Sequence, residues 1–395
     1  MARILFGWDK GLGTGYIDRL LQVARALAAE GHEPALAIRD LVTAAPMLHG
    51  TDWPVFQAPV PVGVLDPVLP QFQPGSFADL LAVANFNDAI ELDRLMRAWD
   101  LLLYVIQPDL IVGEYAPLLA LAAYRRIPTL VMGHGYLVPP PELAQFPIFD
   151  FARQPFTPQD VMLQIVQTVQ RERGMPEAPT LPAAIGGDMS FVTAYGVTDP
   201  YATMRTNPAV GPLERYAPAP PPAHRRFYAY LAADYRPLRQ VLNALVGARM
   251  PGSVFIKRVT PPIRQFLVER GVQVLDHPPP LQEAVTQSSI VIHHGGMATA
   301  TACLGIGRPQ MLWSAVADQA VTTRQLNELG VADVTGIRYA NASDAADGIR
   351  RLASEEARPA RAQDLARRLQ ASGEGGSLDR VLAGARQLLA AAGKA

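Results

Sequence analysis

Residues 290–319 read IVIHHGGMATATACLGIGRPQMLWSAVADQ, and this segment decides the fold. It opens with a short apolar run, which is followed by two histidines, two glycines and a stretch rich in small residues. An apolar run that ends in glycines just before a helix is typical of a buried parallel strand, its loop and its crossover helix. The segment therefore predicts part of a βαβ unit in an α/β protein.

The glycine pair and the start of the following helix predict an anion site. Gly295 and Gly296 allow tight backbone geometry and a close approach of a ligand. The N–H groups of Met297, Ala298 and Thr299 point out of the helix N-terminus, where the helix dipole adds partial positive charge. Because ligands of parallel sheets bind at the carboxyl edge of the strands, a pyrophosphate is the expected occupant.

The same alternation of apolar strands and amphipathic helices occurs in both halves of the chain. The segments that open the two halves are strand 4–7, helix 18–30 and strand 34–38, and then strand 227–231, helix 238–245 and strand 253–256. The proline-rich stretch 207–224 between them predicts a semi-rigid linker. The expected fold class is α/β, with two doubly wound Rossmann-like domains that face each other across a cleft.

The bulk composition excludes several classes of protein. The 395 residues carry a formal net charge of −1, which gives no electrostatic reason to expect nucleic-acid binding. The single cysteine, Cys303, allows neither an intrachain disulfide nor a cysteine metal cluster. The apolar run at the N-terminus is too short for a signal peptide or a membrane span. We expect a cytoplasmic protein with no integral membrane segment, and the sequence does not indicate its oligomeric state.

Asp318 and Gln319 follow the next strand of the segment, where that strand gives way to a helix. A carboxylate and an amide together can bridge neighbouring hydroxyls, which are the repeated feature of a hexose. Asp318 equally fits a helix cap, worth about 1 kcal/mol. The residue types leave both interpretations open.

These motifs together resemble the donor-binding segment of the UDP-glycosyltransferase-like family, which carries HHGG, a small-residue loop and a terminal DQ pair. The resemblance is close over residues 272–335 and looser over much of the chain. It implies that His294 meets the donor diphosphate, that residues 297–299 contact the phosphates, and that Asp318 and Gln319 bind sugar hydroxyls. One departure is Ala298, where the family usually has glycine. Alanine would be strained at a positive φ and harmless within a helix.

The resemblance implies the GT-B fold and an inverting, metal-independent bacterial glycosyltransferase. The expected reaction moves a hexose from a UDP- or dTDP-sugar to a hydroxyl of a small hydrophobic acceptor, with no cofactor besides the donor. The expected parts are an acceptor-binding domain (1–210), the linker (211–225), a nucleotide-sugar-binding domain (226–372) and a C-terminal helix that crosses back to the first domain (373–395). Two alternatives are a catalytically impaired nucleotide-sugar-binding or auxiliary protein of the same fold and a nucleotide-sugar epimerase.

The loop GLGTGY, residues 11–16, opens the first helix of the chain. A dinucleotide-binding fingerprint would require glycine at position 16, although Asp40 stands where such a protein would bind ribose. In the resembling family, a histidine follows the last glycine and deprotonates the acceptor. Tyr16 occupies that place here, and a tyrosine with its ordinary pKa of about 10 is a poor base at neutral pH.

Several residues are candidates for the proton transfer that Tyr16 performs poorly. Asp9 or Asp18 can take the proton while Tyr16 orients the acceptor, His134 can reach in, or the acceptor can be acidic enough to need little help. Glu114 stands where the family often has an acid that orients the base. It equally fits an acid that complements a helix dipole. We expect Tyr16 and Glu114 to line the site.

A metal site at the two adjacent histidines is not expected. Neighbouring residues of a strand point to opposite faces of the sheet, so His293 and His294 rarely reach one ion. We expect His293 to be packed or hydrogen-bonded within the core.

Overall fold

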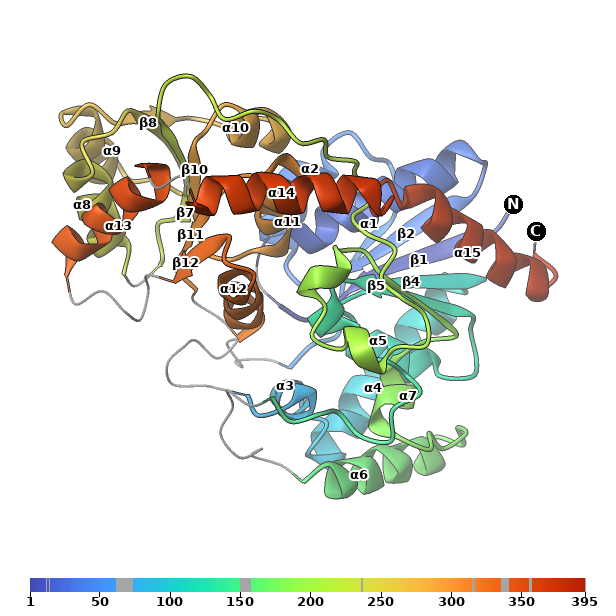
Figure 1. Ribbon diagram of the computed structural model, residues 1–395. Coiled ribbons are helices and arrows are strands. Elements are labelled where there is room, and N and C mark those ends of the chain that lie inside the picture. Colours follow the sequence, from blue (N-terminus) through green and yellow to red (C-terminus); the bar gives the residue numbers. More distant parts are fainter. Residues whose placement is uncertain are drawn as a thin grey trace. The chain divides into compact units, whose positions relative to one another are not determined.

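The computed structural model describes residues 1–11, 13, 15–61, 74–149, 158–235, 237–314, 317–334, 341–354 and 357–394, with the backbone alone at 317, 318 and 334. The chain divides into two compact units (Figure 1). Unit 1 comprises Met1–Leu213 and Gly376–Ala395, and unit 2 comprises Glu214–Gly375. The second change of unit therefore falls in the stretch GEGGS, where Gly373, Gly375 and Gly376 have positive φ.

Unit 1 contains a six-stranded sheet in the order β3-β2-β1-β4-β5-β6, with parallel neighbours throughout. Its strands are β1 (Arg3–Trp8), β2 (Glu33–Ile38), β3 (Val55–Gln57), β4 (Leu110–Glu114), β5 (Thr129–Gly133) and β6 (Met189–Val192). Its α-helices are α1 (Gly15–Ala29), α2 (Leu41–Leu48), α3 (Phe77–Val83), α4 (Ala89–Ile106), α5 (Pro117–Ala123), α6 (Gln159–Glu172), α7 (Leu181–Ile185) and α15 (Leu378–Ala391). Its described residues also form the short 3₁₀ turns η1 (Gly135–Leu137), η2 (Gly196–Thr198) and η3 (Ala202–Met204).

Unit 2 repeats this topology, with the parallel order β12-β11-β10-β7-β8-β9. Its strands are β7 (Phe227–Ala232), β8 (Gly252–Lys257), β9 (Gln273–Leu275), β10 (Ile290–His293), β11 (Gln310–Leu312) and β12 (Ala332–Val334). Its helices are α8 (Leu238–Gly247), α9 (Pro261–Val268), α10 (Leu281–Thr286), α11 (Met297–Ile306), α12 (Ala317–Glu328), α13 (Ala342–Ser354) and α14 (Ala357–Ala371). Both units are therefore doubly wound Rossmann-like domains, as the sequence predicts.

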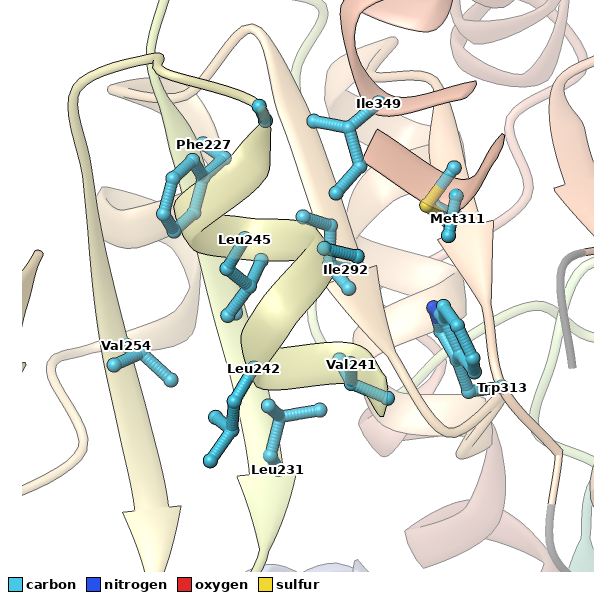
Figure 2. Close-up of a cluster of buried hydrophobic side chains, with 14 of the residues drawn as sticks. Phe227, Leu231, Val241, Leu242, Leu245, Val254, Ile292, Met311, Trp313 and Ile349 are labelled. Carbon is cyan, nitrogen blue, oxygen red and sulfur yellow. The ribbon is translucent and has the colours of Figure 1, made fainter. Parts of the chain in front are cut away.

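The core of unit 2 lies on both faces of its sheet, because successive side chains of a strand point to opposite faces. Ile290 and Ile292 belong to the core cluster on the face of the sheet that packs against α8 and α13. Figure 2 shows Ile292 in this cluster. Val291 points to the other face, against α10 and α11, where Cys303 is also buried. Helix α11 is apolar on nearly all sides because it packs between this face and α14.

Helix α15 completes unit 1 from the end of the chain. It packs against α1, β4 and β5, and Arg386 forms an ion pair with Glu30 at 2.6 Å. Just before this helix, the hydroxyl of Ser377 donates to the carbonyl of Gly211 at 2.7 Å, and its N–H donates to the carbonyl of Pro212 at 3.1 Å. These bonds fasten the returning chain to the segment that leaves unit 1.

A buried arginine fastens the proline-rich segment to unit 2. The guanidinium of Arg308 donates to the carbonyls of Ala219, Pro220 and Ser288 at 2.7–2.8 Å. Gln363 of α14 donates to the same carbonyl of Ala219 at 2.8 Å. The end of the predicted linker is thus held by side-chain donors that satisfy otherwise unpaired carbonyls.

Two stretches of unit 1, residues 59–74 and 139–158, are rich in proline. Residues 62–73 and 150–157 lie outside the described part of the chain, and the described remainder of both stretches forms turns, bends and coil. In the described residues, no helix is both long enough and apolar enough to span a bilayer.

Candidate functional site

Each sheet has its first strand at the centre, and the strand order reverses there. β1 lies between β2 and β4, and β7 lies between β8 and β10. Loops that leave such a switch point diverge and open a crevice at the carboxyl ends of the strands, where ligands of open α/β sheets bind. The GLGTGY loop leaves β1 and the HHGG motif leaves β10, so each motif lies where its unit is expected to bind a ligand.

His294 connects the ends of three strands in unit 2. Its Nε2 accepts a hydrogen bond from the N–H of Ala232 at 3.1 Å, so the ring proton is on Nδ1, which lies 3.3 Å from the carbonyl oxygen of Trp313. Burial lowers the pKa of His294, which keeps the imidazole neutral at pH 7. Contact between His294 and a diphosphate stays a prediction, and it requires exchanging one of these bonds for a phosphate oxygen.

The two glycines have different surroundings. Gly295 has a φ of +88°, and a Cβ added there would lie 2.8 Å from Oγ1 of Thr323 and 3.1 Å from the carbonyl oxygen of Gln319. Glycine is therefore required at position 295 by conformation and by space. Gly296 is exposed, has a φ of −62°, and a Cβ added there would meet no atom within 4 Å.

The N-terminus of α11 carries the features expected of an anion site. The helix begins at Met297, directly after Gly296, and the N-cap position is thus taken by a residue without a side chain. Gly296 and Ala298 are exposed, whereas Met297 and Thr299 are buried. Ala298 lies within the helix and has no positive φ, so alanine is not strained where the resembling family has glycine.

His293 is held in the core, as the sequence predicts. Its Nε2 donates to Oε1 of Gln310 at 2.9 Å, and its Nδ1 accepts the N–H of Gly295 at 3.1 Å. Burial lowers its pKa to about 4. His293 therefore acts as a neutral support that fixes the peptide of Gly295.

Asp318 and Gln319 lie in the first turn of α12. The carbonyl oxygen of Gln319 accepts a hydrogen bond from the hydroxyl of Ser314 at 3.4 Å and lies against Gly295. The first turn of α12 is thus next to the HHGG loop. The side chain of Asp318 is outside the described part of the structure, so sugar binding and capping both stay predictions.

In unit 1, Tyr16 belongs to a buried aromatic cluster. Its ring stacks on Trp8 with centroids 5.7 Å apart and lies 5.8 Å from the ring of Tyr115. The phenol oxygen reaches back to the loop, because a Cβ added to Gly11 would lie 2.9 Å from it. Gly11 has a φ of +89°, a conformation that favours glycine.

Glu114, Arg19 and His134 meet near the carboxyl ends of β4 and β5. Glu114 is fully buried, and its Oε1 accepts from Nε of Arg19 at 2.6 Å. His134 is also buried, and its Nδ1 has no hydrogen-bond partner among the described residues. Burial, and secondarily the charge of Arg19, lower the pKa of His134 to about 3, so its ring is neutral at pH 7.

The two aspartates near the loop have different environments. Asp18 is exposed and accepts from Nε2 of Gln22 at 3.3 Å. Asp9 is buried, and its Oδ2 accepts the N–H of Leu119 in the first turn of α5 at 2.9 Å. Its Oδ1 has no partner among the described residues, and burial raises its pKa to about 7. Asp9 is therefore poised to exchange a proton near neutral pH.

Sequence reasoning did not identify Arg19. It is a charged residue on the buried side of α1, three positions after Tyr16, and this pattern is the sequence signal that could have identified it.

An open depression of about 710 Å³ between α2 and β3 is lined by Leu41, Ala45, Pro46, Leu48, His49 and Val55, none of them a candidate residue. Among the described side chains, no group of three histidine, cysteine, aspartate or glutamate residues is placed to hold a metal ion.

The comparisons with known proteins rest on structure. No protein family and no curated protein matches the chain by sequence. The glycosyltransferase VinC in complex with dTDP is 17% identical and has a TM-score of 0.63, over 96% of this chain and 99% of that one. The rhamnosyltransferase SpnG with spinosyn aglycone is 16% identical with a TM-score of 0.67, over 97% and 100%. The glycosyltransferase SnogD from Streptomyces nogalater is 19% identical with a TM-score of 0.59, over 99% and 100%. The chain therefore has the fold of the GT-B glycosyltransferases.

Proposed function

We propose that the chain is a glycosyltransferase that moves a hexose from a UDP- or dTDP-sugar to a hydroxyl of a small hydrophobic acceptor. The observation that carries this proposal is the N-terminus of α11, which directly follows Gly295 and Gly296 at the switch point of unit 2. A diphosphate there receives backbone N–H groups and the positive end of the helix dipole. The same groups stabilise the charge that develops on the departing diphosphate, so the reaction needs no metal ion in this scheme.

The named ligands of similar structures support this choice of donor and acceptor. VinC was crystallised with dTDP, and SpnG with thymidine diphosphate and with spinosyn aglycone. Asp318 and Gln319 are proposed to orient the sugar from the first turn of α12. Attack by the acceptor on the face opposite the diphosphate would invert the anomeric carbon.

Asp9 is our proposed general base. It combines an unpartnered Oδ1 with a pKa of about 7, which matches the optimum for a base that works at neutral pH. Tyr16 has its phenol against Gly11, and the neutral His134 is a far weaker base. Glu114 is committed to Arg19, so it orients that part of the site, and the exposed Asp18 is the remaining alternative.

The proposal is tested by calorimetry and turnover on the full chain. Expected results are binding of dTDP or UDP, and transfer with inversion, seen by NMR at the anomeric carbon, that persists in EDTA. Asp9→Asn should lower kcat by about 10²–10⁴-fold with nucleotide affinity kept. Lack of nucleotide binding, or transfer that requires a divalent ion, would contradict the scheme.

A second candidate is a nucleotide-sugar-binding protein without catalysis. The burial of Tyr16 between Trp8 and Tyr115, in the place of the expected base, favours it. Tight donor binding with no transfer to a broad panel of acceptors, and no effect of Asp9→Asn on donor hydrolysis, would select this candidate.

A further inference from the structure

An ion pair lies beside His294 at the carboxyl ends of β7 and β8. The strands run in register from Phe227 and Gly252 to Ala232 and Lys257, and the N–H of Ala233 donates to the carbonyl of Lys257 at 3.0 Å. Asp234 and Arg258 follow directly, and the guanidinium of Arg258 donates to Oδ2 of Asp234. The two side chains therefore leave neighbouring strands at the same edge as the HHGG loop.

The pair belongs to the same electrostatic environment as His294. The ring of Tyr235, next to Asp234, lies 4.4 Å from the ring of His294. The carboxylate of Asp234 is close enough to raise the pKa of His294 against the larger effect of burial. A charge change at Asp234 therefore acts on His294, next to which the diphosphate is proposed to bind.

The pair contributes little to stability. The side chains of Asp234 and Arg258 are 64% and 63% exposed, and exposed ion pairs typically contribute about 0–1 kcal/mol. Arg258 moreover has a φ of +59°, a conformation that disfavours residues other than glycine. An exposed arginine in a weak ion pair is available to a stronger anion.

We propose that Arg258 is a nucleotide-binding residue, which leaves Asp234 and pairs with a phosphate of the donor's nucleoside diphosphate. This inference rests on the proposed function, because it places the diphosphate at α11. A neutral His294 and a helix dipole only partly balance a diphosphate, and a guanidinium adds a full charge in a fork that fits two phosphate oxygens. Asp234 then competes with the phosphate for Arg258.

The competition predicts opposite effects of the two partners. Arg258→Ala should weaken dTDP or UDP binding about tenfold or more, whereas Asp234→Asn should strengthen it several-fold. Thymidine or uridine, which lack phosphate, should bind both variants as they bind the unaltered chain. Arg368→Ala, which breaks the exposed pair with Asp364 on α14, is the matched control and should change no affinity.

Isothermal titration calorimetry at two salt concentrations tests the proposal. Opposite signs for Arg258→Ala and Asp234→Asn, with a smaller salt dependence for Arg258→Ala, would support it. Equal affinities, or a loss in both variants, would overturn it, because a merely structural pair gives the same sign for both. If the unaltered chain binds neither nucleotide, the proposed function fails instead, so the two failures are distinguishable.

Discussion

Nε of Arg19 lies 2.6 Å from Oε1 of Glu114, and this buried ion pair joins the first turns of α1 to the end of β4. Arg19→Met should lower the free energy of unfolding by about 3–5 kcal/mol, because it leaves a charge buried without its partner. The double variant Arg19→Met with Glu114→Leu should recover most of this loss. Denaturant unfolding of these variants and the unaltered chain measures the effect. A double variant that loses as much stability as the two single substitutions added together would contradict it.

Gly295→Ala should destabilise the HHGG loop by about 1–3 kcal/mol and weaken nucleotide binding. The cause is the φ of +88° together with the contact of the new Cβ with Thr323. Gly296→Ala is the matched control, since its φ is −62° and its Cβ meets open space. Thermal unfolding with and without dTDP compares them, and equal melting temperatures for the two variants would refute the distinction.

Asp9 makes stability depend on pH. Burial raises its pKa from 3.8 to about 7, so the folded state holds this proton more tightly than the unfolded state. Its contribution is complete below about pH 4 and is lost as the pH rises through about 7. Asp9→Asn should therefore gain stability relative to the unaltered chain between about pH 4 and pH 8, by on the order of 2–4 kcal/mol. Denaturant titrations measure the difference in free energy of unfolding between Asp9→Asn and the unaltered chain. A difference that stays constant across this pH range would contradict the raised pKa of Asp9.

Arg308→Leu should lower the stability of unit 2 by about 3 kcal/mol or more. The substitution leaves the buried carbonyl of Ser288 and the carbonyl of Pro220 without the guanidinium, and Ala219 keeps only the bond from Gln363. Arg367→Leu, on the exposed face of α14, should change stability by less than about 0.5 kcal/mol. Proteolysis near residue 219 reports the release of the segment, and equal cleavage rates would argue against the fastening.

Removing α15 by ending the chain at Gly376 should unfold unit 1 and leave unit 2 folded. The helix buries Val381, Leu382, Ala385 and Leu389, and their loss costs on the order of 5 kcal/mol. Amide hydrogen exchange, measured on peptides from each unit, reports the protection of the two units separately. Normal protection of β4 and β5 in the shortened chain would disprove this dependence.

The sequence predicted most strands and helices because long apolar runs and amphipathic periods mark them. It missed the edge strands β3, which has three residues in a proline-flanked segment, β6, in which only Val192 is buried, and the three-residue β12. Such strands are placed by pairing with neighbours rather than by their own pattern. The HHGG loop and the helix that begins directly after it were predicted from local residues alone, and anion binding there stays a prediction.

The rest of the candidate site depends on contacts between distant segments. Arg19 and Glu114 are 95 positions apart, and Asp234 and Arg258 belong to separate strands. No local pattern indicates that such charges meet. The pKa of Asp9 likewise depends on burial under α5, which becomes visible only once the sheet is assembled.

Unit 1 receives its last helix from residues 378–391, after the whole of unit 2 has been made. During synthesis on the ribosome, the surfaces of α1, β4 and β5 that α15 covers must wait for more than 160 further residues, from Glu214 to Gly375, to be translated. Unit 2 is continuous in sequence and can close its core first. The order in which the nascent chain matures is thus the reverse of the order in which its two halves begin, and the half-finished first unit is the species that molecular chaperones would meet.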